Sequence, residues 1–129
     1  MSILQPTILL IDDTPDHLEV VRRFLLSAGY RVVAAASGHE ALASADVVMP
    51  DLIITALSLP GQLAWETARR LHARPQLSHT PILGTTVYGT LLPSSRVRDL
   101  GCADLIEKPF DFDNLLYHIG RLLPASSAG

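Results

Sequence analysis

Short runs of apolar residues alternate along this chain with longer segments in which apolar residues recur every three or four positions. The short runs have the length and composition of buried strands, and the longer segments have the period of amphipathic helices. Five strands are predicted, at residues 8–11, 31–35, 52–55, 81–85 and 103–106. Strands that alternate with helices predict an α/β fold, a doubly wound parallel sheet covered on both faces.

Local signals predict where the helices begin and end. Thr14 and Pro15 suit the N-cap and the first position of a helix that Gly29 ends. Ser37 and Glu40 have the spacing of a capping box at the start of a second helix. Apolar residues at helical spacing predict further helices at about residues 65–71, 94–100 and 112–123. The expected fold therefore has five strands and five helices.

Composition limits the class of protein. A length of 129 residues suits one domain, expected at residues 1–123, with a disordered tail or truncated linker at 124–129. A net charge of −3 with dispersed arginines argues against a nucleic-acid partner. No apolar stretch reaches the roughly 18 residues of a membrane span, and Cys102 is the only cysteine, which excludes an internal disulfide. We therefore expect a cytoplasmic protein with no membrane partner and no nucleic-acid partner.

A candidate site lies at the ends of the predicted strands. Asp12 and Asp13 follow the first strand, Thr86 follows the fourth, and Lys108, the only lysine, follows the fifth. Because the carboxyl ends of parallel strands meet at one edge of a sheet, these side chains are expected to share one crevice. Carboxylates, a hydroxyl and an ammonium suit a divalent cation and a phosphoryl group. The third strand ends at Ala56, whose methyl group can neither accept a phosphoryl group nor ligate a metal.

Taken alone, each of these signals also has a simpler explanation. An Asp-Asp pair after a strand is often a turn or a helix cap, and threonine is common at strand ends. Together, however, the residues favour a functional site over these simpler explanations. Adjacent carboxylates repel each other unless a cation lies between them, and Lys108 can supply that cation. Cys102 is expected to be a buried or half-buried thiol without nucleophilic function. The histidines lack the spacing of a metal site and are expected on the surface: His17, His39, His72, His79 and His118.

With this arrangement the chain resembles the receiver domain of two-component response regulators over residues 7–123. The resemblance implies a flavodoxin-like sheet with strand order 2-1-3-4-5. It also implies that Asp12 and Asp13 hold Mg2+, assisted by the backbone carbonyl of Ser58. Thr86 and Lys108 correspond to the hydroxyl and the ammonium of the phosphate pocket.

Departures from the family pattern centre on the phosphoacceptor. The family's acceptor aspartate corresponds to Ala56, so the resemblance carries over the fold without the phosphorylation chemistry, and Mg2+ is expected to bind only weakly. Leu105 stands at the switch position, where the family couples an aromatic residue to the threonine, and it has no ring to move between surface and core. Val87 and the pair Leu63-Ala64 replace residues that usually shape the mouth of the pocket.

By resemblance the chain is expected to be a signalling module of a phosphorelay, not an enzyme, that acts through protein contacts. Two origins fit Ala56: a natural pseudo-receiver, or an Asp-to-Ala variant of an ordinary receiver. The first helix corresponds to the face that meets a histidine kinase or a phosphotransfer domain. The fourth helix, the fifth strand and the last helix correspond to the face used by a homodimer or an output partner.

Two other classes share parts of the pattern. A phosphatase of the haloacid-dehalogenase type also carries acids after its first strand, but it needs an Asp-x-Asp spacing, whereas Asp12 and Asp13 are adjacent. A flavodoxin-like cofactor domain binds FMN at the same edge of its sheet. There the first loop needs backbone donors and hydroxyls for a phosphate, and this loop holds acids instead. Both alternatives fit the sequence less well than the receiver domain.

Overall fold

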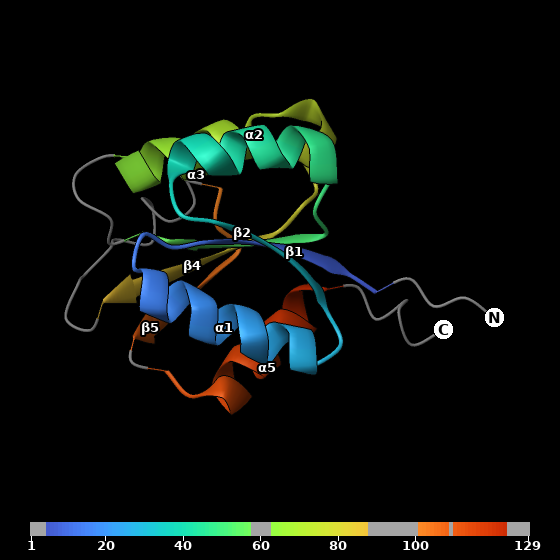
Figure 1. Ribbon diagram of the computed structural model, residues 1–129. Helices are drawn as coiled ribbons and strands as arrows, with labels where there is room; N and C mark the ends of the chain where they lie inside the picture. Colours follow the sequence, from blue (N-terminus) through green and yellow to red (C-terminus); the bar gives the residue numbers. More distant parts are fainter. Residues whose placement is uncertain (1–4, 58–62, 88–100, 109, 124–129) are drawn as a thin grey trace.

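The computed structural model contains a parallel sheet between two layers of helices (Figure 1). It describes residues 5–57, 63–87, 101–108 and 110–123, and residues 63–65 and 87 are described by their backbone alone. The strands are β1 (Thr7–Ile11), β2 (Arg31–Ala35), β3 (Leu52–Ala56), β4 (Ile82–Val87) and β5 (Asp104–Lys108). They pair in parallel in the order β2-β1-β3-β4-β5, which confirms the predicted sheet and its strand order.

The helices cover both faces of this sheet. The described helices are α1 (Pro15–Ser27), α2 (Gly38–Val48), α3 (Leu63–His72), the short 3-10 helix η1 (Pro75–Leu77) and α5 (Phe112–Leu122). Helices α1 and α5 lie on one face, and α2 and α3 lie on the other (Figure 1). Four of the five expected α-helices are thus present, and η1 was not predicted. The expected fourth helix, at residues 94–100, and the tail at 124–129 lie outside the described residues.

The residues predicted to start α2 and to end α1 do so in the structure. Ser37 Oγ accepts a hydrogen bond from the Glu40 N–H at 3.1 Å, and Glu40 Oε1 accepts one from the Ala36 N–H at 2.9 Å. This is the predicted capping box, with the glutamate reaching one residue further back. Gly29 follows the last turn of α1 with φ +100°, a conformation that other residues rarely adopt. Both signals set where a helix meets the loop at a strand end.

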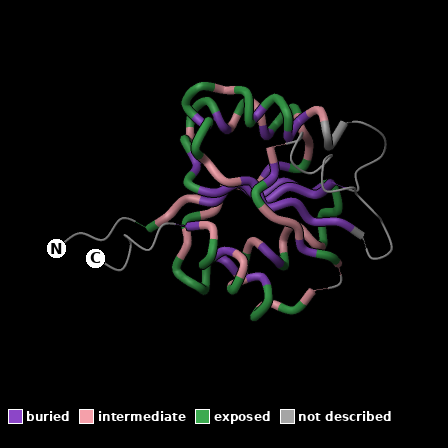
Figure 2. The backbone as a smooth tube through the Cα atoms, turned by 180° about the vertical axis from the view of Figure 1, so that it is seen from behind, coloured by how far each residue is buried: buried purple, intermediate pink, exposed green. Residues whose placement is uncertain are grey.

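Alternation along the strands divides the core into two clusters, one on each face of the sheet. Ile8 and Leu10 of β1 pack with α1 and α5, whereas Leu9 and Ile11 pack with α2 and α3. The strands in the middle of the molecule are buried along almost their whole length (Figure 2). By the same alternation Ala56 faces the α1 and α5 side, so a residue at this position points toward the layer that carries α1.

Gly84 in β4 makes room for two side chains that the sequence did not link. A Cβ atom at Gly84 would lie 2.5 Å from Leu57 Cδ1 and 2.8 Å from Leu105 Cδ2. Leu105, the residue at the expected switch position, is therefore packed against the cluster on the α2 and α3 face. Leu57 directly follows Ala56 and is 4% exposed. The absence of a side chain at Gly84 thus permits the packing beside the end of β3.

Replacing Gly84 with alanine is expected to lower the free energy of unfolding by about 1–3 kcal/mol, because the new methyl group overpacks a filled core. Urea unfolding measures this change. Gly120→Ala is the matched control, since a Cβ there meets nothing within 4 Å. Because Gly120 lies inside α5, that control should raise stability by about 0.5–1 kcal/mol. Equal effects of the two substitutions would contradict the described packing of Leu57 and Leu105.

Candidate functional site

The candidate site forms where the central strands end. Ile11 of β1 is in register with Thr55 of β3, so the next residues along the two strands, Asp12 and Ala56, are neighbours. The Asp12 N–H continues the sheet by donating to the Ala35 carbonyl at 3.1 Å. Asp12 is 3% exposed and Ala56 is 2% exposed. A buried carboxylate therefore lies beside a buried methyl group at the edge of the sheet.

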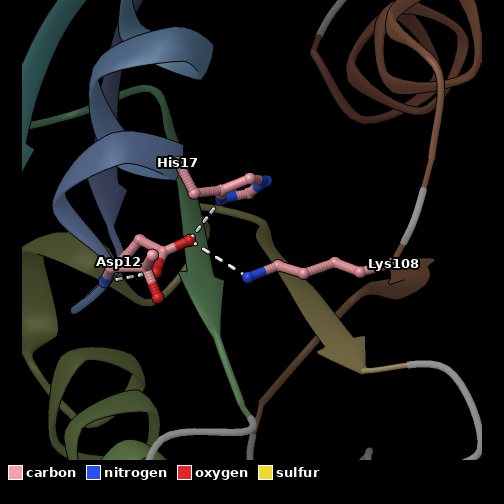
Figure 3. Close-up of polar contacts among 4 residues, drawn as sticks. Asp12, His17 and Lys108 are labelled. Carbon is pink, nitrogen blue, oxygen red and sulfur yellow. Dashed lines mark hydrogen bonds and ion pairs between the residues drawn. The ribbon is translucent and has the colours of Figure 1, made fainter.

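Three hydrogen-bond donors surround the Asp12 carboxylate. Its Oδ1 accepts from the Thr14 N–H at 3.0 Å, which fixes the turn into α1. Its Oδ2 accepts from Lys108 Nζ at 3.1 Å and from His17 Nδ1 at 2.5 Å (Figure 3). An ionised carboxylate can only accept, so the His17 tautomer with hydrogen on Nδ1 fits this contact. Residues that follow β1, begin α1 and end β5 thus meet at the Asp12 side chain.

The balance of burial and donors sets the charge of Asp12. Burial alone raises the pKa of a carboxyl group, because it disfavours the charged form. The Thr14 amide, His17 and Lys108 outweigh this effect and hold the pKa of Asp12 below its ordinary value of 3.8. A carboxylate whose pKa is lowered on folding stabilises the fold above its unfolded-state pKa, and this contribution is lost as the pH falls through the folded-state pKa. Asp12 is therefore charged at neutral pH and contributes to stability there.

The other predicted site residues are placed less centrally. Asp13 is exposed, and within the described residues its side chain forms no hydrogen bond or ion pair. Thr86 is 3% exposed in β4, opposite Glu107 of β5, without a side-chain hydrogen bond to another described residue. Ser58 lies outside the described residues, as do the side chains of Leu63, Ala64 and Val87. The structure thus joins Asp12 to Lys108 and leaves Asp13 on the surface.

Of the five histidines predicted on the surface, two are half-buried, His17 and His118, and both bind a carboxylate. His17, in the first turn of α1, binds Asp12 and packs edge-on against Phe110, with ring centroids 5.9 Å apart. His118 of α5 binds Asp104 Oδ2 of β5 at 2.8 Å. His17 could have been found from its position, because the first turn of a helix that starts directly after a strand-end carboxylate lies over that carboxylate. The three that are exposed as predicted are His39, His72 and His79.

The side chains of this site offer too few free oxygen ligands for Mg2+. Mg2+ needs near-octahedral oxygen ligands at about 2.0–2.1 Å. Asp12 is already shared by three nitrogen donors, and Ala56 supplies no ligand. Within the described part of the chain, no group of three or more histidine, cysteine, aspartate or glutamate residues could hold a metal ion. These residues do not fit a Mg2+ site as they are arranged.

Burial also limits the reactivity of the cysteine. Cys102 is 7% exposed, and burial raises the pKa of its thiol to about 11, so the nucleophilic thiolate is scarce at neutral pH. The predicted burial of Cys102 is confirmed.

In the described part of the chain, no helix is both long enough and apolar enough to cross a bilayer.

Comparison with known proteins connects this site to one family. The model of the response regulator receiver domain matches residues 8–120. The DNA-binding dual master transcriptional regulator RpaA of Synechocystis is 34% identical over 118 residues, which cover 92% of this chain. The match takes in 49% of RpaA, so the chain spans about half the length of that relative.

Solved structures agree with the sequence comparison. The chemotaxis response regulator CheY4 of Vibrio cholerae has a TM-score of 0.85 and 30% identity, and the match covers 93% of this chain and 100% of CheY4. The response regulator TrrA of Thermotoga maritima, solved in complex with Mg2+ and BeF, has a TM-score of 0.81 and 26% identity. That match covers 92% of this chain and 100% of TrrA. Neither the phosphatase nor the flavodoxin-like alternative is favoured by these comparisons.

Proposed function

Because the chain belongs to the response regulator receiver domain family, we propose that it is a two-component signalling module that works without accepting a phosphoryl group. The observation that carries this proposal is Ala56 at the end of β3, beside Asp12. The place of Ala56 at the end of β3, beside Asp12, supports our assignment of this residue to the family's phosphoacceptor position. An alanine there removes the only nucleophile that this chemistry uses.

The remaining side chains of the site do not replace the missing nucleophile. Phosphoryl transfer needs an oxygen that can approach phosphorus in line with the leaving group. The oxygens of Asp12 are held by Thr14, His17 and Lys108 inside the pocket. Asp13 is an exposed carboxylate on the loop before α1. Neither acid therefore stands where Ala56 stands, since Asp12 is buried with three donors on its oxygens and Asp13 lies on the surface.

A receiver that takes no phosphoryl group must signal through a surface that is already formed. We assign the kinase or phosphotransfer contact to the face of α1, where Val20 and Leu26 are exposed apolar residues. We assign a homodimer or output contact to β5 and α5, where Tyr117 is 60% exposed. Such contacts would be regulated by the amount of the partners. This assignment holds whether Ala56 is natural or replaces an aspartate.

We expect no phosphoryl incorporation when the chain is incubated with Mg2+ and either acetyl phosphate or a phosphorylated phosphotransfer domain. Intact-mass measurement would show an unchanged mass, and a receiver domain with an acceptor aspartate, treated in parallel, would show that the donor is active. The physical reason is the missing nucleophile at Ala56. A phosphoryl group that peptide mapping places on Asp12 or Asp13 would overturn the proposed function.

A further inference from the structure

Nitrogen donors of the protein contact both oxygens of the Asp12 carboxylate, at positions that a metal ion would otherwise take. Its side chain is 5% exposed. An ionised carboxylate has about four acceptor directions. Three donors use them: the Thr14 N–H on Oδ1, and Lys108 Nζ and His17 Nδ1 on Oδ2. A divalent ion that approached Oδ2 would have to displace a nitrogen and would also face the positive charge of Lys108.

His17 is held in this position by its own surroundings. It stands in the first turn of α1, whose start is fixed by Pro15 and by the Thr14 hydrogen bond to Asp12. Its ring meets Phe110 edge-on at an interplanar angle of 79°. Phe110 lies just beyond β5, the strand that ends in Lys108. The histidine and the lysine therefore reach the same carboxylate oxygen from α1 and β5 (Figure 3).

We propose that His17 takes the place of a divalent cation in this pocket: its Nδ1 holds Asp12 Oδ2 in place and keeps metal ions from that carboxylate. The inference rests on the function proposed above and specifies how the same site is regulated. His17 is a positioning residue that acts through Asp12. The module then keeps one pocket arrangement at every Mg2+ concentration, so its contacts with partners do not depend on metal.

The test is His17→Leu, a substitution that removes the nitrogen donor and retains an apolar contact with Phe110. Isothermal titration with MnCl2 and MgCl2 measures the affinity for each ion. We expect Mn2+ to bind the variant at least about tenfold more tightly than it binds the unaltered chain. His79→Leu is the matched control, because His79 is an exposed histidine away from the pocket, and it should bind Mn2+ like the unaltered chain. Equal affinities of the unaltered chain and His17→Leu would overturn the proposal.

A second measurement uses the unaltered chain and does not depend on the variant folding. The ring nitrogens of His17 are observed by NMR during addition of Mg2+ and then of paramagnetic Mn2+. We expect a protonated Nδ1 whose signals stay unchanged with Mg2+ and are not selectively broadened by Mn2+. Selective broadening at His17 would show that Mn2+ binds in the pocket beside His17 and Asp12, and the proposal would fall.

The two proposals fail in different ways. If the unaltered chain binds Mg2+ as tightly as His17→Leu and still takes no phosphoryl group, the role of His17 is wrong and the proposed function stands. If the unaltered chain takes a phosphoryl group, the proposed function itself is wrong. Metal titration and intact-mass measurement on the same sample therefore separate them.

Discussion

Lys108→Met is expected to lower the free energy of unfolding by about 1–3 kcal/mol at neutral pH, because it leaves a buried carboxylate with one donor fewer. The Asp12 side chain is 5% exposed and that of Lys108 is 20% exposed, so water replaces the lost ammonium poorly. Methionine retains the length and apolar character of the lysine stem. The measured effect therefore reports mainly on the Lys108–Asp12 contact at 3.1 Å. Urea unfolding at constant ionic strength gives the value.

The same substitution has a defined pH dependence. Lys108 is one of the groups that lower the pKa of Asp12, so its removal raises the folded-state pKa of Asp12. Above both folded-state pKa values the stability difference between parent and variant is constant. As the pH falls through these values, Asp12 becomes protonated and the difference shrinks. Unfolding curves at pH 7 and at several values below pH 4 would follow this convergence.

Arg23→Met provides the matched control for Lys108→Met. Arg23 also forms an ion pair, with Glu19 on α1, but its side chain is 75% exposed. Solvent screens such a pair, so its loss should change stability little. If the two variants lose the same stability, or if the effect of Lys108→Met does not change with pH, the buried contact with Asp12 contributes less than its geometry suggests.

The strands could be predicted from their apolar runs, and their order from the resemblance to the receiver domain. A near-continuous apolar run such as β3 belongs in a parallel sheet covered on both faces, and all five of its residues are buried. The predicted strand ends were less accurate: β4 ends at Val87 and β5 ends at Lys108, each two residues beyond its predicted end. Three of the added residues, Thr86, Glu107 and Lys108, are polar, so the apolar pattern ends before the strand pairing does.

The site could be predicted only in part, because its central contacts depend on side-chain direction. Strand-end geometry brings Asp12 and Lys108 together, although 96 residues separate them. The same rule cannot decide which of two adjacent acids points inward, and Asp13 is exposed. It also does not include His17, which is found only by asking which residue of the first turn of α1 lies over Asp12. The packing of Leu105 depends on the missing side chain of Gly84, which is a three-dimensional property.

Ala56→Asp is expected to destabilise the metal-free protein and to create a strong response to Mg2+. A third carboxylate on the α1 and α5 face, next to Asp12, adds like-charge repulsion that His17 and Lys108 offset in part. We expect a loss of roughly 1–2 kcal/mol without metal. A ligand that binds only the folded state at 100 times its dissociation constant stabilises that state by about 2.7 kcal/mol. Saturating Mg2+ should therefore raise the melting temperature of the variant well above its metal-free value.

Three comparisons make this prediction specific. The unaltered chain should respond to Mg2+ much less than Ala56→Asp does, since it lacks the third carboxylate. The double variant Ala56→Asp, His17→Leu should respond more strongly still, because the competing nitrogen is gone. Slow labelling of Ala56→Asp by acetyl phosphate would favour natural loss, because Val87 and the pair Leu63-Ala64 depart from the family pattern, whereas rapid labelling would favour an altered ordinary receiver. Identical melting curves for the unaltered chain and Ala56→Asp throughout a Mg2+ titration would mean that residue 56 and Asp12 do not share a site, and the assignment of Ala56 to the acceptor position would be wrong.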